Sequence, residues 1–114
     1  MPSTTEQYDA IVTVWKSGQY DDAIAQMLKL HETSPTFALA AAALAAWNQK
    51  IGKPDDAIKY AEKYCELAPD DSFGFSILSS YYISVGLHNE AEDAQMKARN
   101  LRIAAQLKSH GDNE

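Results

Sequence analysis

Three glycines at a constant spacing constrain the fold of this chain more than any other feature of its sequence. They are Gly18, Gly52 and Gly86, and the second interval equals the first. An alanine follows each of them after the same short distance, at Ala23, Ala57 and Ala91. A fixed period of about 34 residues lies in the range typical of repeat proteins, in which one short structural unit stacks on the next. The sequence therefore predicts three units, at about 4–37, 38–71 and 72–105, within a single domain that spans 1–114.

Each unit contains two segments whose apolar residues have the spacing of a helix face. In the first unit, Tyr8, Ile11 and Trp15 mark one segment, and Ala23 and Met27 mark the other. The glycine between the two segments allows a positive φ and ends the first helix. We therefore expect an all-α fold of six helices, each antiparallel to its neighbours in the chain.

The positions of these small residues resemble the tetratricopeptide repeat family, whose unit is a helix-turn-helix of about 34 residues. The closing proline of that family matches Pro35 and Pro69, and its first-helix leucine and tyrosine match Leu78 and Tyr82. In the first unit, the usual tryptophan, leucine and glycine of the family are replaced by Gln7, Ala10 and Ile11. The resemblance implies an α-solenoid of three repeats.

The third unit lacks the closing proline, because Ile103 stands in its place. We therefore expect an extended last helix, from His88 to about residue 109, that Gly111 ends before a tail at 110–114. The outward positions of the second helix are mostly apolar in the first two units. In the third unit they are Glu92, Gln95 and Arg99. A stack of repeats needs such a polar outer face where it ends, so the sequence predicts that no fourth unit follows.

A second apolar stripe lies on the side of the last helix opposite to its core-facing alanines. It consists of Met96, Ile103 and Leu107. Scattered exposed apolar residues of this kind are common and need no function. The same stripe could also form an interface for self-association, which would make the chain a homodimer or another homo-oligomeric structural element. Both interpretations stay open at the level of sequence.

The resemblance also implies a concave groove, lined by the first helix of each unit, in which family members bind peptides or helices. The corresponding positions here are Tyr8, Val12, Trp15, Leu39, Ala43, Ala46, Phe73, Ile77 and Ser80. This lining is apolar, so we expect it to hold an apolar or amphipathic segment of another protein by burying apolar area. An alternative for Leu39 and Ala43 is packing between neighbouring helices. We expect that packing for Ala40, Ala41, Leu44 and Ala45.

Some members of the family clamp the C-terminal carboxylates of heat-shock chaperones with lysine, asparagine and arginine. The corresponding positions in this chain are Tyr8, Val12, Ala43, Phe73 and Ile77, which carry neither a positive charge nor a carboxamide. A dicarboxylate would lose its hydration there without gaining charge-assisted hydrogen bonds, so this class of partner is disfavoured. The apolar lining is more similar to that of small three-repeat chaperones of secretion systems, which suggests a small adaptor or chaperone.

Charge and composition exclude several other classes of partner. The chain has 16 acidic and 10 basic residues and a formal net charge of −6, which disfavours binding to nucleic acid or to anionic membranes. The run from Phe37 to Trp47 is the longest apolar stretch and is too short to span a bilayer. No secretory signal is visible, and the single cysteine, Cys65, cannot form an internal disulfide. We therefore expect a cytoplasmic protein.

The sequence gives no sign of catalytic or metal chemistry. The three histidines, His31, His88 and His110, are far apart and lack metal-ligand spacing. Cys65 has no evident base beside it, so we expect a buried structural thiol. A small catalytic domain would need a convergent polar pocket, and no glycine fingerprint, phosphate loop or paired-carboxylate motif points to one. We predict a protein-binding module without metal or cofactor, and not an enzyme.

Overall fold

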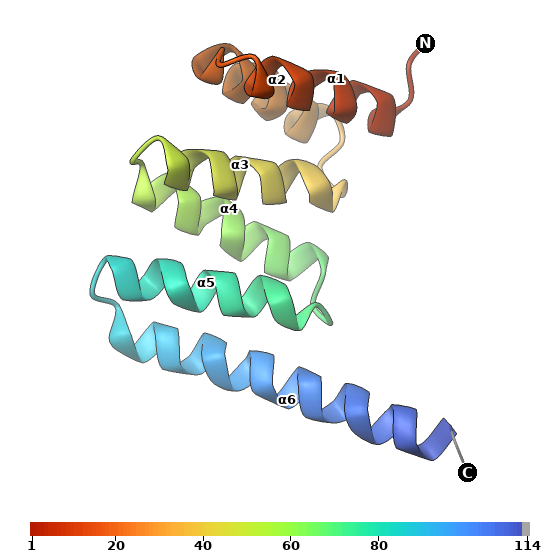
Figure 1. Ribbon diagram of the computed structural model, residues 1–114, viewed down its shortest axis with the longest axis vertical. Coiled ribbons are helices and arrows are strands. Elements are labelled where there is room, and N and C mark those ends of the chain that lie inside the picture. The colour runs from red at the N-terminus through yellow and green to blue at the C-terminus, as the bar shows by residue number, and fades with distance from the viewer. Residues whose placement is uncertain (113–114) are drawn as a thin grey trace. The chain divides into compact units, whose positions relative to one another are not determined.

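The computed structural model describes residues 1–112, which form six α-helices and no strand. The helices are α1 (Thr4–Lys16), α2 (Tyr20–Thr33), α3 (Ala38–Lys50), α4 (Pro54–Leu67), α5 (Ser72–Ser84) and α6 (His88–Asp112) (Figure 1). The helices α1, α3 and α5 start at the same interval as the three glycines, and so do α2, α4 and α6. The period of the sequence is thus also the period of the helices, and the predicted all-α fold of three helix-turn-helix units is confirmed.

The three repeated glycines end the first helix of each of the three repeats. Their φ angles are +92° at Gly18, +81° at Gly52 and +82° at Gly86, in a region that residues with a Cβ atom rarely adopt. The next N–H group turns back to the helix: Lys53 N donates to the carbonyl of Asn48 over 2.8 Å. This pairing closes the helix end and lets the chain reverse within a few residues.

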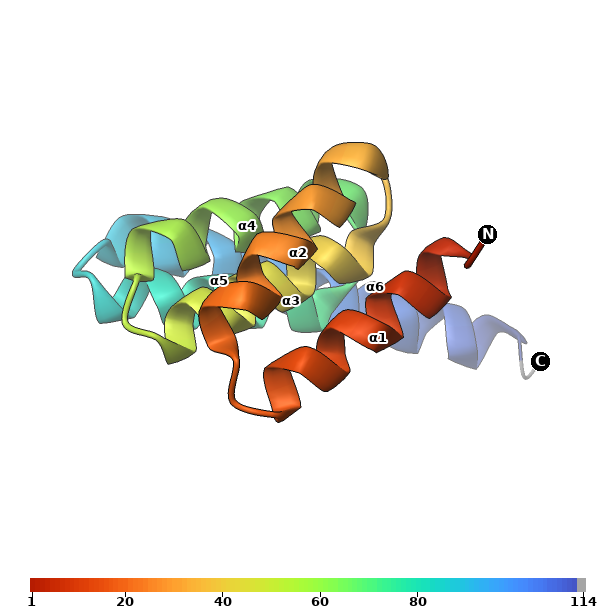
Figure 2. The same cartoon turned by 90° about the horizontal axis from the view of Figure 1, so that it is seen from above.

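The helices form two compact units, and the first of them, Met1–Leu67, contains α1 to α4. Within it α1 packs on α2, α2 on α3, and α3 on α4, as the view from above shows (Figure 2). The core of this unit is built around Met27, Leu30, Leu44 and Trp47, which are at most 8% exposed. As expected, Ala40, Ala41, Leu44 and Ala45 are also buried. The all-round apolar character of α3 follows from its place between α2 and α4.

The repeated alanines lie at the tightest positions of the second helices. Ala23 and Ala57 are fully buried and Ala91 is 3% exposed. The carbonyl of Ala91 accepts a hydrogen bond of 2.8 Å from Ser79 Oγ on α5, so the two helices come close at this point. A small side chain is required there because a larger one would hold the helices apart.

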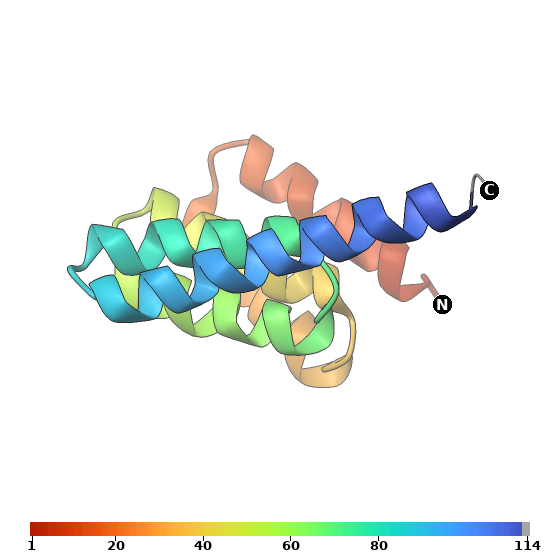
Figure 3. The ribbon, with the colours of Figure 1, turned by 90° about the horizontal axis from the view of Figure 1, so that it is seen from below.

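The second unit begins at Ala68 and contains α5 and α6. The two helices pack side by side, and α6 then continues past the start of α5 (Figure 3). The buried face of α6 consists of Ala91, Ala94 and Ala98. Beyond the hydrogen bond of 3.3 Å from Arg102 Nη1 to Ser76 Oγ, every residue from Ile103 to Gly111 is exposed. The last turns of α6 are therefore free of contact within this unit.

The end of α6 differs from the sequence prediction. The helix continues to Asp112, so the expectation that it stops near residue 109 at Gly111 is wrong. Gly111 does not have a positive φ and lies inside the helix. A glycine disfavours a helix only by about 1 kcal/mol relative to alanine, which does not suffice to end one without a capping contact. The last two residues of the predicted tail, 113–114, lie outside the described residues.

The outer face of α6 is polar, as expected. Glu92, Gln95 and Arg99 are all exposed. The equivalent residues of α4 are Ile58, Ala61 and Cys65, and each of them is at most 9% exposed. Burial of Cys65 agrees with a structural thiol.

Candidate peptide-binding surfaces

The predicted groove residues of the first unit lie on α1 and α3 and differ in exposure. Leu39 is 46% exposed and Ala46 is exposed, whereas Tyr8, Val12 and Trp15 are half-buried. Ala43 is only 7% exposed and belongs to the core cluster. For Ala43 the structure thus favours the alternative of packing between helices, and Leu39 has the more open position.

Aromatic contacts fix the position of α1 against α3. The ring of Trp15 stacks on Trp47 with centroids 4.7 Å apart and an interplanar angle of 2°. Tyr8 meets Phe37 edge to face at 5.8 Å. Burial, and secondarily the neighbouring Asp9, raises the pKa of the Tyr8 hydroxyl, so this phenol stays neutral. Two predicted groove residues thus also hold the first unit together, a role that the sequence analysis did not assign to them.

The second unit carries its share of the predicted groove residues on α5. Phe73 is 70% exposed, Ile77 is half-buried and Ser80 is exposed. The side chain of Asp71 caps α5 by accepting a hydrogen bond of 3.0 Å from Phe73 N. Phe73 therefore sits on a fixed first turn and presents a large apolar ring to solvent.

The stripe on α6 is exposed along its length. Met96 is 57%, Ile103 45% and Leu107 68% exposed. Its residues lie away from the alanine face that packs on α5, and Leu107 belongs to the last turns of α6, beyond the hydrogen bond from Arg102 to Ser76. The stripe is thus available for contact, although exposure alone does not distinguish its two interpretations.

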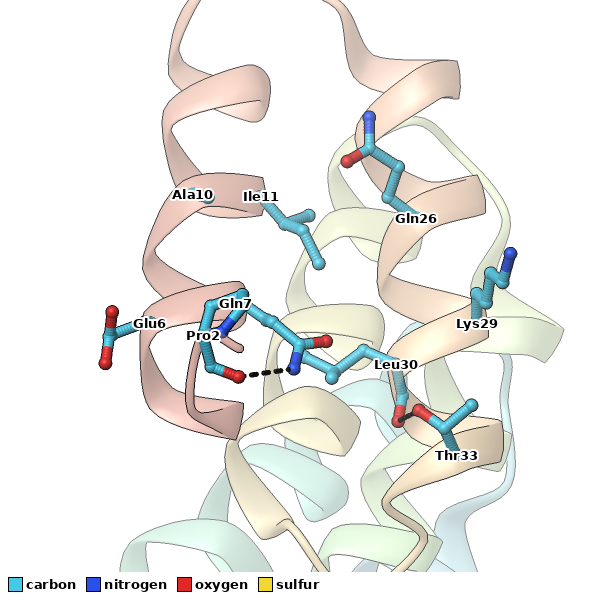
Figure 4. Close-up of a pocket in the computed structure, with 9 residues that line it drawn as sticks. All are labelled: Pro2, Glu6, Gln7, Ala10, Ile11, Gln26, Lys29, Leu30 and Thr33. Atoms are coloured by element: carbon cyan, nitrogen blue, oxygen red, sulfur yellow. Dashed lines mark hydrogen bonds between the residues drawn. The ribbon is translucent and has the colours of Figure 1, made fainter.

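A hollow of about 490 Å³ lies between α1 and α2 (Figure 4). Its lining residues are Pro2, Glu6, Gln7, Ala10, Ile11, Gln26, Lys29, Leu30 and Thr33. This site was not predicted from the sequence. In the first repeat, Gln7 and Ala10 stand where the tetratricopeptide repeat family usually has tryptophan and leucine. This replacement is the sequence signal that points to the hollow.

His31 lies at the end of α2, in a second hollow of about 500 Å³ whose other lining residues are Lys59, Tyr60, Glu62, Lys63 and Glu66. Its ring meets Tyr60 edge to face at 5.9 Å, and its Nδ1 atom is buried without a hydrogen-bond partner. Burial lowers the pKa of His31, and Lys63 and Lys59 lower it further against the opposing effect of Glu32. The neutral imidazole is therefore the form that the fold prefers.

The lowered pKa of His31 predicts a dependence of stability on pH. The unfolded chain takes up this proton first, so the free energy of unfolding should fall as the pH drops from about 6.5, the usual histidine value, through the lowered value of the folded state. His31→Phe keeps a ring against Tyr60 but cannot titrate. Urea unfolding at several pH values should show a flatter profile for His31→Phe than for the wild type. Equal profiles for wild type and His31→Phe would contradict this assignment.

Within residues 1–112 no three side chains of His, Cys, Asp and Glu are grouped to hold a metal ion. In the same range no helix is both long and apolar enough to cross a membrane.

Comparison of the sequence with known proteins gives no match to a family model or to a curated protein. Solved structures, however, match in shape. MamA superposes with a TM-score of 0.83 at 20% identity, covering 91% of this chain and 61% of the MamA chain. Another MamA structure is covered to 59% of its length, so the chain spans about three fifths of these relatives.

Two further structures extend the comparison. The second TPR of Spaghetti (RPAP3), solved with the HSP90 peptide SRMEEVD, has a TM-score of 0.75 at 23% identity and is covered over 91% of its length by 86% of this chain. A chain of the CopN–Scc3 complex has a TM-score of 0.80 at 17% identity, with coverage of 86% of this chain and 58% of the other. At these identities the comparison shows the fold alone. Together with the regular period of the helices, it shows that this chain has the tetratricopeptide-repeat fold, with three repeats.

Proposed function

We propose that this chain is a protein-interaction module, an adaptor or small chaperone, that binds an apolar or amphipathic segment through exposed apolar residues on the first helices of its repeats. The observation that carries the proposal is that each compact unit exposes a large apolar side chain on such a helix: Leu39 is 46% exposed on α3 and Phe73 is 70% exposed on α5. Burying one such side chain contributes about 1.5–3 kcal/mol.

Neighbouring structures support binding of another polypeptide. One was solved with an HSP90 peptide and another as a complex of two proteins. The peptide SRMEEVD is acidic, however, and the positions that would face it here are apolar, as at Val12 and Ile77. This chain therefore selects an apolar ligand and rejects a carboxylate-rich one.

The test uses two probes: a neutral amphipathic helical peptide of leucine and glutamine, and SRMEEVD. Titration calorimetry should detect the first and not the second. Leu39→Glu combined with Phe73→Glu should weaken binding of the neutral peptide at least about tenfold, the equivalent of about 1.4 kcal/mol, because each carboxylate would be desolvated on binding.

Leu87→Glu serves as the matched control, because Leu87 is 42% exposed but lies in the turn before α6. It should bind the neutral peptide like the wild type. Circular dichroism establishes that each variant is folded. Unchanged binding by a folded double variant would exclude Leu39 and Phe73 from the binding site.

Self-association through α6 is a second candidate function, favoured by the exposure of Met96, Ile103 and Leu107. Sedimentation over a wide concentration range separates the two functions. A dimer that Ile103→Glu with Leu107→Glu dissociates would support self-association. A strict monomer at high concentration would exclude it.

A further inference from the structure

The hollow between α1 and α2 is separate from the face proposed to bind peptides. None of the predicted groove residues lines it. Its floor is apolar and closed, since Ile11 is 7% and Leu30 3% exposed. In Figure 4, Ile11 points into the gap between the two helices and Gln7 reaches across its lower end. A volume of about 490 Å³ lies in the range of small-ligand sites in proteins, about 300–1,000 Å³.

Comparison of the three repeats shows what is missing from this hollow. Gln7 on α1 corresponds to Ala41 and Phe75 in the later repeats, because each lies one repeat period from the next. By the same spacing, Gln26 on α2 corresponds to Tyr60 and Ala94. Each later repeat thus has one aromatic residue at this pair of positions, and the first repeat has two glutamines instead.

The second unit shows the effect of such an aromatic residue. Phe75 stands there at the position of Gln7 and, with Leu78, Tyr82 and Ala94, lines a hollow of about 280 Å³ between α5 and α6. The hollow of the first repeat is larger, at about 490 Å³, and has a glutamine in place of this ring. It therefore has room for an aromatic group that the chain itself does not supply.

The polar groups around the hollow define the chemistry of that group. Gln7 Nε2 donates to the carbonyl of Pro2 over 3.1 Å, and Gln26 Nε2 donates to Asp22 Oδ1 over 3.2 Å. Each amide therefore still has its Oε1 atom as an acceptor. Figure 4 shows both oxygens on the sides that face the gap.

We propose that this hollow is a binding site for the indole of a tryptophan that a partner protein presents. An indole has one N–H donor and a large apolar ring. The donor matches the amide oxygens of Gln7 and Gln26, and the ring matches the apolar side chains of Ile11 and Leu30. The site is independent of the peptide-binding face, and either can fail without the other.

The experiment titrates the full chain with two probes, indole and 1-methylindole, and follows its methyl NMR signals. Indole should shift the signals of Ile11 and Leu30. 1-Methylindole lacks the N–H donor, so it should bind about two- to tenfold more weakly, the effect of one lost hydrogen bond. No shift at Ile11 and Leu30, shifts confined to Leu39 and Ile77, or equal affinities of the two probes would overturn the proposal.

A substitution then fills the site from within. Gln7→Trp places an indole at the position that Phe75 has in the third repeat, so it should abolish the shifts at Leu30 and raise the melting temperature. Thr13→Trp adds the same side chain to an exposed position of α1 outside the hollow, and should leave indole binding unchanged. Ala10→Leu tests the same site with a smaller change if Gln7→Trp does not fold. A folded filling variant that binds indole like the wild type would overturn the assignment.

Discussion

Replacing Trp47 by alanine should lower the free energy of unfolding by about 3–5 kcal/mol, the largest effect that we expect from a single substitution in this chain. Trp47 is 8% exposed and belongs to the core cluster that joins α1, α2 and α3. Its ring also stacks on Trp15 at 4.7 Å. Removing it leaves a cavity and deprives Trp15 of a stacking partner, so the ring contact between α1 and α3 at this point is lost.

Chemical denaturation followed by far-UV circular dichroism measures this loss. Leu39→Ala on the same helix is the control, because Leu39 is 46% exposed and its truncation should change the stability by no more than about 0.5 kcal/mol. Trp47→Phe should lie between the two, since it keeps a ring in the stack. If Trp47→Ala were as stable as Leu39→Ala, the core described around Trp47 would be incorrect.

The helical register could be predicted from the sequence because it depends on local rules. A positive φ at Gly18, Gly52 and Gly86 follows from the way glycine ends a helix. Burial of Ala57 follows from its fixed distance to the glycine before it. The end of α6 depends instead on the weak helix propensities of exposed residues. Gly111 alone does not end the helix there, so the prediction of an end near residue 109 was wrong.

The roles of Trp47 and Ala43 could not be predicted because α3 is apolar on every side. Periodicity identifies a helix face only where polar residues mark the opposite side. In the run from Phe37 to Trp47 such a mark is absent, so the spacing does not separate core from surface. Burial of Ala43 and the stacking of Trp47 on Trp15 depend on the neighbouring helices, which the sequence of α3 does not describe.

The hollow between α1 and α2 could not be predicted for a different reason. Gln7 and Gln26 line it from two different helices, at positions where each later repeat has one aromatic residue. Each is an ordinary exposed glutamine when considered by itself. Gln7 stands where the repeat pattern has an aromatic residue, which indicated a departure from that pattern. Only the packing of α1 on α2 shows that Gln26, opposite Gln7, does not supply the missing ring.

Replacing Ala57 by leucine should destabilise the chain by about 1–3 kcal/mol through overpacking. Ala57 is fully buried on α4, which packs on α3. Ala91 is the equivalent alanine of the third repeat. Its carbonyl accepts a hydrogen bond from Ser79 on the other helix of the pair, so this repeat position lies where the two helices come close. The larger side chain at Ala57 can be accommodated only if α3 and α4 move apart.

Thermal unfolding measures the effect as a decrease of several degrees in Tm. Ala25→Leu is the matched control, because Ala25 is exposed on α2 and leucine has nearly the helix propensity of alanine. The difference between the two variants therefore isolates packing from helix formation. Since the repeat period assigns Ala23, Ala57 and Ala91 to one structural position, Ala23→Leu should reproduce the loss. If Ala57→Leu and Ala25→Leu had the same Tm, α3 and α4 would not meet at Ala57. The alignment that relates the three repeats would then be wrong.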